Sequence, residues 1–190
     1  MKLPLNNPRI VSTFGAIRTI NGITRKHQGL DIISNSRDKQ IKAVKSGIYR
    51  GNFYDKNGFG NYVSVQHDDG IRTIYAHLES INKDLKKGQR VSAGDLLGTE
   101  GTTGFSTGIH LHIEARKSPY FQNNRIDISE YLGIKNERGV VQYTCKGEAM
   151  KKIQEKAGLE DKTMDYLDKY EFNEDLFRKL AKAMGGEEQC

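Results

Sequence analysis

The sequence predicts a mainly β, antiparallel domain that is followed by a small α-helical region. Two observations lead to this prediction. Up to residue 135, short runs of β-branched and aromatic residues recur about every ten residues, and glycine-containing turns separate them. Beyond residue 147 the residues are good helix formers, with apolar positions three and four apart. We therefore expect a β domain over residues 1–134, a linker over 135–146 and a helical C-terminal appendage over 147–190.

The expected strands are four runs in which β-branched and aromatic residues dominate. They cover residues 48–53, 62–67, 71–76 and 110–115. A further run, residues 86–98, is punctuated by glycines and predicts a hairpin similar to the turns of barrel-sandwich folds. Together these runs indicate an antiparallel, barrel-sandwich-like β domain.

The helical region contains three amphipathic runs, which predict two or three helices. The first has apolar residues at Met150, Ile153 and Ala157, and the other two cover residues 164–170 and 176–184. The apolar surface of these runs is small. We therefore expect the helices to pack on the β domain, on a partner or on another copy of the chain.

Four of the five histidines lie in three short patterns, one of which contains an aspartate. The first pattern joins His27 to Asp31, and the second places His77 at the end of an expected strand. The third is a His-x-His pattern, His110 and His112, within another expected strand. Side chains two residues apart share one face of a strand, so these two histidines should point the same way.

Such a set of residues is typical of a hydrolytic zinc site. Catalytic zinc takes three protein ligands drawn from His, Asp, Glu and Cys, and leaves the fourth position for water. Here two histidines and one aspartate supply the ligands, and two histidines remain for proton transfer. A single histidine on a strand is more often a packed or solvated residue, but the coincidence of three patterns favours a site.

The same residues resemble the lysostaphin-like, LytM-type zinc endopeptidases that cut bacterial peptidoglycan. The resemblance runs from about residue 8 to about residue 114, through ordered blocks at 12–15, 27–32, 43–47, 60–63, 67–70, 75–78 and 101–114. It implies a catalytic domain with a substrate groove and one zinc ion per chain. It further implies that His27, Asp31 and His112 bind the zinc, while His77 and His110 lie beside the catalytic water without binding metal.

Three features are less fixed by the resemblance. Members of the family often place a tyrosine upstream of the first ligand, but residues 16–26 contain none, so an oxyanion donor would come from elsewhere. Glu114 shares the face of the His-x-His pair and either orients a histidine or ends the strand in solvent. His67 precedes a turn, and we expect it to belong to a hairpin rather than to the site.

The resemblance implies hydrolysis of peptide bonds in a cross-bridge or stem peptide of peptidoglycan. Because that substrate lies outside the membrane and the N-terminal residues lack the pattern of a secretory signal, we expect a phage endolysin or a virion-associated lysin. One alternative is a non-catalytic relative that binds or activates other wall hydrolases, although no site residue is missing. A second alternative is a biotin carrier, suggested by Met150-Lys151. Biotin acceptors carry Met-Lys-Met on a β-turn, whereas here Lys152 follows within a helical pattern.

Charge is uneven along the chain. Residues 1–135 carry 20 Lys and Arg against 12 Asp and Glu, whereas residues 136–190 carry 10 against 12. A basic catalytic module would be attracted to the anionic polymers of a Gram-positive wall. The basic residues are dispersed and form no stripe, which argues against nucleic acid as a partner.

The N-terminal residues contain no apolar run, and no later stretch has the length of a membrane span. We therefore expect no signal peptide and no transmembrane segment. Action on the wall would follow holin-type release, transport as part of a virion, or secretion with the leader removed.

The two cysteines, Cys145 and Cys190, lie outside all the motifs, and we expect free thiols, with a disulfide between them as the alternative.

Overall fold

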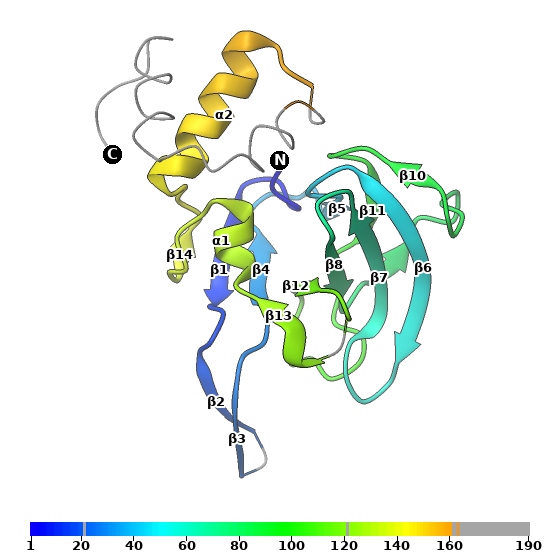
Figure 1. The fold of residues 1–190 in the computed structure, drawn as a ribbon. Helices are drawn as coiled ribbons and strands as arrows, with labels where there is room; N and C mark the ends of the chain where they lie inside the picture. Colours follow the sequence, from blue (N-terminus) through cyan, green and yellow to red (C-terminus); the bar gives the residue numbers. More distant parts are fainter. Residues whose placement is uncertain (21, 121, 161–162, 164–190) are drawn as a thin grey trace.

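Antiparallel β-structure makes up most of the computed structural model, which describes residues 1–20, 22–120, 122–160 and 163 (Figure 1). The largest sheet has nine strands in the order β10-β6-β7-β8-β12-β4-β1-β14, with β13 paired to β12. Its strands are β1 (Pro8–Ser12), β4 (Leu30–Ser34), β6 (Gly47–Asp55), β7 (Gly60–His67), β8 (Ile71–Ala76), β10 (Arg90–Val91), β12 (Leu111–Lys117), β13 (Arg125–Ile126) and β14 (Gly139–Val140). The expected mainly β, antiparallel fold is confirmed.

Two smaller sheets flank the large one. The first has the order β5-β11-β9, and the second is the β2–β3 hairpin, which projects from the end of the domain (Figure 1). Their strands are β2 (Ile17–Ile20), β3 (Ile23–Lys26), β5 (Gln40–Lys42), β9 (Ser80–Ile81) and β11 (Leu96–Thr99). The hairpin expected over residues 86–98 is not formed, because β10 pairs with β6 while β11 pairs with β5 and β9.

The centre of the large sheet consists of β8, β12 and β4. Leu30 and Ile32 on β4 and Leu111 and Ile113 on β12 are at most 1% exposed. Burying four such side chains contributes roughly 1.5–3 kcal/mol each before the entropy cost of ordering them. The register of these strands is therefore strongly fixed, since a slip of one residue would turn this set away from the core.

Beyond β12 the chain forms a short 3-10 helix, Gln122–Asn124, and two α-helices, α1 (Ile128–Leu132) and α2 (Cys145–Ala157). Helix α2 begins after the N-cap Thr144, whose side chain accepts a hydrogen bond from the Gly147 backbone N–H, and ends at Gly158 in a left-handed conformation. The first of the expected helices is thus present. The second and third fall outside the described residues, as does Cys190.

The segment expected to be a linker contributes to the sheet. Within residues 135–146, β14 pairs with the edge strand β1, and the Asn136 side chain exchanges hydrogen bonds with the backbone of Phe14. Such a pairing supplies hydrogen-bond partners for the backbone N–H and C=O groups that an edge strand otherwise leaves unpaired. The division of the chain into a β domain and a helical appendage remains a prediction.

In the part of the chain that is described, no helix has the length and apolarity needed to cross a membrane.

Candidate metal centre and active site

Three side chains from two neighbouring strands converge at one end of the large sheet. His27 precedes β4, Asp31 lies on β4, and His112 lies opposite Asp31 on β12. The Asp31 Oδ1 atom is 3.1 Å from His27 Nε2 and 2.7 Å from His112 Nδ1, and the two nitrogens are 3.1 Å apart. All three residues are buried.

This triangle fits a zinc ion. Zinc bonds of about 2.0–2.1 Å in a tetrahedral arrangement place neighbouring ligand atoms about 3.3 Å apart, within about 0.6 Å of the three separations here. Two imidazole nitrogens and one carboxylate oxygen are also a donor set that zinc prefers. Within the described residues, this is the one group of three or more histidine, cysteine and acidic side chains that could hold a metal ion.

The two imidazole rings are oriented by hydrogen bonds on their far sides. His27 Nδ1 lies 2.8 Å from the Thr13 carbonyl oxygen, and His112 Nε2 lies 3.3 Å from Glu114 Oε1. Because an oxygen acceptor requires a ring N–H, a neutral ring held in this way can turn the lone pair of its opposite nitrogen toward a metal in the triangle, once the proton shared with Asp31 has been released. This tautomer is the one that a metal requires.

Gly29, between the first two candidate ligands, allows the rings to approach. A Cβ atom at this position would lie 2.5 Å from the Ile113 carbonyl oxygen and 2.7 Å from His112 Cε1. Any larger residue would therefore displace the His112 ring or the backbone of β12. The His-x-Gly-x-Asp spacing thus has a packing reason as well as a chemical one.

The carboxylate of Asp31 divides its two oxygens between different partners. Oδ2 accepts a hydrogen bond of 2.5 Å from Arg18 Nη2, which leaves Oδ1 facing the two histidines. Burial alone would raise the pKa of Asp31, but the hydrogen bonds and charges of His112 and His27 hold it far below its usual range. Asp31 is therefore ionised at neutral pH.

Glu114 is buried and carries a network of its own. Its Oε2 atom accepts hydrogen bonds from Arg116 Nε at 2.7 Å and from Arg125 Nε at 3.0 Å. Burial by itself would raise its pKa, but the hydrogen bond from His112 and the neighbouring charges lower the pKa to about 2. Of the two expectations for Glu114, the structure matches the carboxylate that orients a histidine, not the strand end in solvent.

The remaining two histidines of the motifs lie next to the triangle. The His77 ring centroid is 4.8 Å from that of His110 and 5.9 Å from that of His112. Their Nδ1 atoms lie 2.8 Å from the carbonyl oxygens of Thr103 and Gly108, respectively. Both rings therefore donate from Nδ1 and keep the Nε2 lone pair for other contacts.

His77 has two unusual properties. Its backbone φ of 64° is in the left-handed region, which non-glycine residues rarely adopt. Burial lowers the pKa of its ring to about 4, so the ring is neutral at neutral pH. A strained backbone and a perturbed pKa at one residue are common at functional sites.

The structure thus brings together all five predicted site residues, and it keeps His67 apart from them. His67 is buried, with Nδ1 3.0 Å from the Ser46 carbonyl oxygen and Nε2 2.7 Å from Thr73 Oγ1. Tyr75, one of the tyrosines available as an oxyanion donor, is a fully buried core residue whose hydroxyl accepts from the Val44 backbone N–H.

Sequence reasoning missed Arg18, Arg125 and Phe59. Phe59 stacks against the His112 ring with centroids 5.7 Å apart. Arg18 lies within residues 16–26, where related enzymes often have a tyrosine, and its guanidinium is a hydrogen-bond donor of another kind at that place in the sequence. Arg125 and Phe59 reach the site through loops and pairings that local sequence patterns do not predict.

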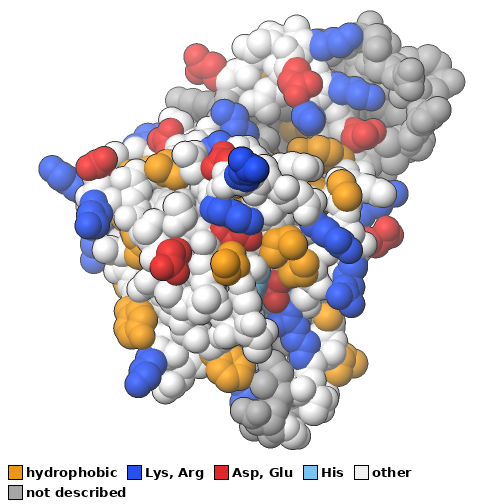
Figure 2. Space-filling view, turned by 180° about the vertical axis from the view of Figure 1, so that it is seen from behind, with side chains coloured by type: hydrophobic (Ala, Val, Ile, Leu, Met, Phe, Trp, Pro, Cys, Tyr) orange, Lys and Arg blue, Asp and Glu red, His pale blue; other side chains and the backbone are white. Residues whose placement is uncertain are grey.

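A groove of about 400 Å³ runs beside the triangle. His27 and His112 are among its lining residues, together with side chains from the β2–β3 hairpin and from two loops. In the space-filling view, part of a histidine is visible near the centre of the face, between hydrophobic and acidic side chains, with Lys and Arg side chains further out (Figure 2). The candidate site is therefore open to an extended ligand.

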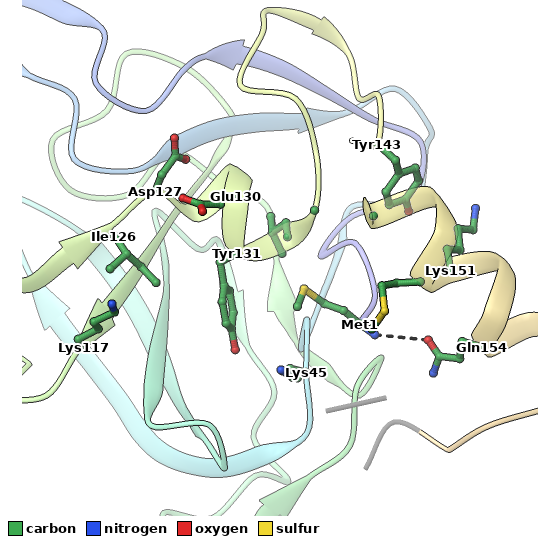
Figure 3. Close-up of a pocket in the computed structure, with 14 residues that line it drawn as sticks. Met1, Lys45, Lys117, Ile126, Asp127, Glu130, Tyr131, Tyr143, Lys151 and Gln154 are labelled. Carbon is green, nitrogen blue, oxygen red and sulfur yellow. Dashed lines mark hydrogen bonds between the residues drawn. The ribbon is translucent and has the colours of Figure 1, made fainter. Parts of the chain in front are cut away.

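A second cavity, of about 340 Å³, lies between α1 and α2. Tyr131 and Lys45 lie on one side of it, and Met1 and Gln154, joined by a 3.4 Å hydrogen bond, lie on the other (Figure 3). None of the five candidate site residues lines this cavity. The groove beside the histidines is therefore the one relevant to the candidate chemistry.

A mainly β domain in which two histidines and an aspartate converge beside two further histidines defines the class of a metallohydrolase. The chain belongs to peptidase family M23, whose family model matches residues 25–128. Peptidases of this family are metalloenzymes that use zinc, and the His-Asp-His triangle fits that ion.

Curated relatives agree with this assignment. The chain is 37% identical over 116 residues to the DD-carboxypeptidase/endopeptidase Mpg of Neisseria meningitidis. The matched region covers 60% of this chain and 25% of the relative. The chain is 32% identical over 127 residues to the peptidoglycan DD-endopeptidase ShyC of Vibrio cholerae, covering 66% of this chain and 28% of the relative. The chain thus spans about a quarter of the length of these relatives.

Solved structures resemble the fold over a similar range. The catalytic domain of the antimicrobial peptidase lysostaphin from Staphylococcus simulans is 30% identical, with a TM-score of 0.58, over 66% of this chain and 92% of that domain. A zinc-containing peptidase from Vibrio cholerae is 28% identical, with a TM-score of 0.54, over 65% of this chain and 37% of that protein.

Proposed function

We propose that this chain is a zinc-dependent endopeptidase that hydrolyses peptide bonds in bacterial peptidoglycan, in a cross-bridge or a stem peptide. The observation that carries the proposal is the convergence of His27, Asp31 and His112 on one point, with His77 and His110 beside it. The similarity to a peptidoglycan DD-endopeptidase supports the substrate class.

His27, Asp31 and His112 would hold the zinc ion, which supplies Lewis acidity that polarises the scissile carbonyl and acidifies the attacking water. His77 is neutral at neutral pH, so its Nε2 can accept the proton that the water loses. His110 would provide the second ring that donates a proton to the leaving amine or stabilises the developing oxyanion. Glu114 and Arg18 would hold His112 and Asp31 in place.

We further propose that the protein degrades cell walls as a lysin, of the kind that phages use as endolysins or carry in virions. The support is its likeness to the catalytic domain of an antimicrobial peptidase and the basic charge of residues 1–135. Its action would then lie outside the cytoplasmic membrane, on the wall itself. A binding module without activity is the second candidate, and the presence of all five site residues argues against it.

Digestion of purified walls tests the proposal. Walls of Gram-positive and Gram-negative type are treated with the protein as isolated, after removal of metal by a chelator, and after zinc is restored, and the fragments are analysed by mass spectrometry. We expect new amino termini to appear with the first and third samples and to be absent from the second. If folded, zinc-loaded protein released no fragments from any wall, the endopeptidase proposal would be wrong and the binding module would replace it.

A further inference from the structure

We propose that the groove beside the histidine triangle is a subsite for a carboxylate carried by the substrate peptide. This inference rests on the proposed endopeptidase function and deepens it. It names a chemical group that the substrate carries close to the bond that is cut.

The groove has a local excess of cationic side chains. Arg18, Arg25, Lys26 and Arg125 line it, against the single carboxylate of Glu114. Lys and Arg number 30 and Asp and Glu number 24 in the whole chain, so the ratio in the groove does not simply reflect a basic composition. Two of the four cations already have a carboxylate partner, Arg125 in Glu114 and Arg18 in Asp31, so the uncompensated positive charge of the groove comes from Arg25 and Lys26.

Two of these cations face each other. Arg18 on β2 and Arg25 on β3 are directly opposite in the hairpin register, and cross-strand partners project from the same face. Arg18 has Asp31 as a counter-charge. Among the described residues, neither Arg25 nor Lys26 forms an ion pair, and both are exposed. Like charges in a cross-strand pair destabilise a hairpin, and an anion bound between them would remove that repulsion.

The other wall of the groove differs in character. It is formed by Asn57, in the turn between β6 and β7, and by Phe105, in the loop before β12. A hydrogen bond of 2.9 Å from the Phe105 backbone N–H to the Gly58 carbonyl oxygen joins these two loops. The groove thus offers an aromatic surface on one side and cationic groups on the other, which suits an aliphatic stem that ends in a carboxylate.

The groove also lies to one side of the candidate reaction centre. His27 and His112 line it, whereas His77 and His110 do not. A peptide whose scissile bond lies at the triangle would therefore place residues from one side of that bond in the groove. Guanidinium groups bind carboxylates through paired, charge-assisted hydrogen bonds, so a carboxylate is the group we assign to this subsite.

Binding of matched peptides tests the assignment. The probes are acetyl-Gly-Gly-Glu-Gly-Gly-amide, its Gln counterpart and acetyl-pentaglycine with a free C-terminal carboxylate. The uniform glycines let the single carboxylate reach the groove in any register. Titrations follow backbone amide NMR signals of the full chain without metal, which prevents hydrolysis and removes zinc as a rival binder of carboxylate. The zinc-loaded chain is then titrated with the peptides that it does not cleave.

We expect a carboxylate peptide to bind roughly tenfold more tightly than the Gln peptide, the scale of one charge-assisted hydrogen bond at an exposed site. The preference should weaken as salt is raised. The Glu and free C-terminal peptides show whether a side-chain or terminal carboxylate is preferred. The double variant Arg25→Gln/Lys26→Gln should lose the preference, whereas Lys86→Gln/Lys87→Gln, which has the same net charge and lies outside the groove, should keep it.

Equal binding of both carboxylate peptides and the Gln peptide would overturn the subsite, as would a preference that the Arg25→Gln/Lys26→Gln variant retains. Wall digestion decides the endopeptidase function separately, because these titrations require no cleavage. A protein that cuts walls but shows no carboxylate preference would therefore refute the subsite and leave the endopeptidase function intact.

Discussion

Replacing Glu114 by Gln should destabilise the metal-free protein by about 3 kcal/mol. The carboxylate is 1% exposed and is the shared partner of Arg116, Arg125 and His112. Its pKa is lowered from 4.5 to about 2, and a difference of that size corresponds to about 3 kcal/mol of stabilisation at neutral pH. Removing one partner of a buried charge network generally costs roughly 3–5 kcal/mol, which agrees in scale.

The assay is urea denaturation in the presence of a chelator, with the free energy of unfolding extrapolated to water. Because the folded pKa of Glu114 lies below its unfolded value, its contribution is complete above about pH 4.5 and is lost as the pH falls towards 2. The difference between the wild type and Glu114→Gln should therefore shrink over that interval. Glu79→Gln, at an exposed position, serves as the control and should change stability by less than about 0.5 kcal/mol. A loss below about 1 kcal/mol for Glu114→Gln at pH 7 would refute the reasoning.

Three further predictions concern the metal centre. Gly29→Ala should displace the His112 ring and weaken zinc binding by at least roughly tenfold in a chelator competition. Unchanged affinity would contradict this prediction, because it would show that the backbone of β12 can shift without moving the ligand. Arg18→Gln frees Asp31 Oδ2 and should weaken zinc binding by roughly 10–100-fold while leaving the circular dichroism spectrum unchanged; an affinity equal to wild type would contradict the positioning role. Burial alone would lower the pKa of His112, but its hydrogen bonds to Asp31 and Glu114 raise it, so zinc binding near neutral pH should release a proton. Calorimetry in two buffers of different ionisation enthalpy measures that release, and identical heats in both would contradict it.

Much of the site could be predicted because strand periodicity and motif chemistry act together. The alternation along β12 places His112 and Glu114 on one face, and the pairing of β12 with β4 then sets His112 opposite Asp31. Local patterns cannot report which distant loops close over that face. Arg18, Arg125 and Phe59 reach the site through a hairpin, a short strand and a turn, so they became visible only in three dimensions.

The fold shows the same division between local and distant signals. The long strands β6, β7, β8 and β12 follow from their residue patterns, and their expected ranges agree with the structure. The pairing of β14 with β1 does not follow from local sequence. The two residues Gly139–Val140 have no strand-like pattern of their own, and they are extended because they pair with the edge strand β1. Likewise, glycine spacing in residues 86–98 marks turns without specifying that β10 and β11 pair with different partners.

Zinc content and activity of five alanine variants would test the central claim most directly. The claim is that His27, Asp31 and His112 hold the metal while His77 and His110 move protons. Alanine at each of the first three positions should abolish zinc retention and wall digestion together. Alanine at each of the last two should retain one zinc per chain and lower the rate of wall digestion by at least roughly a hundredfold. Loss of zinc from the His77 or His110 variant, or retention of zinc by the His112 variant, would contradict this division of roles.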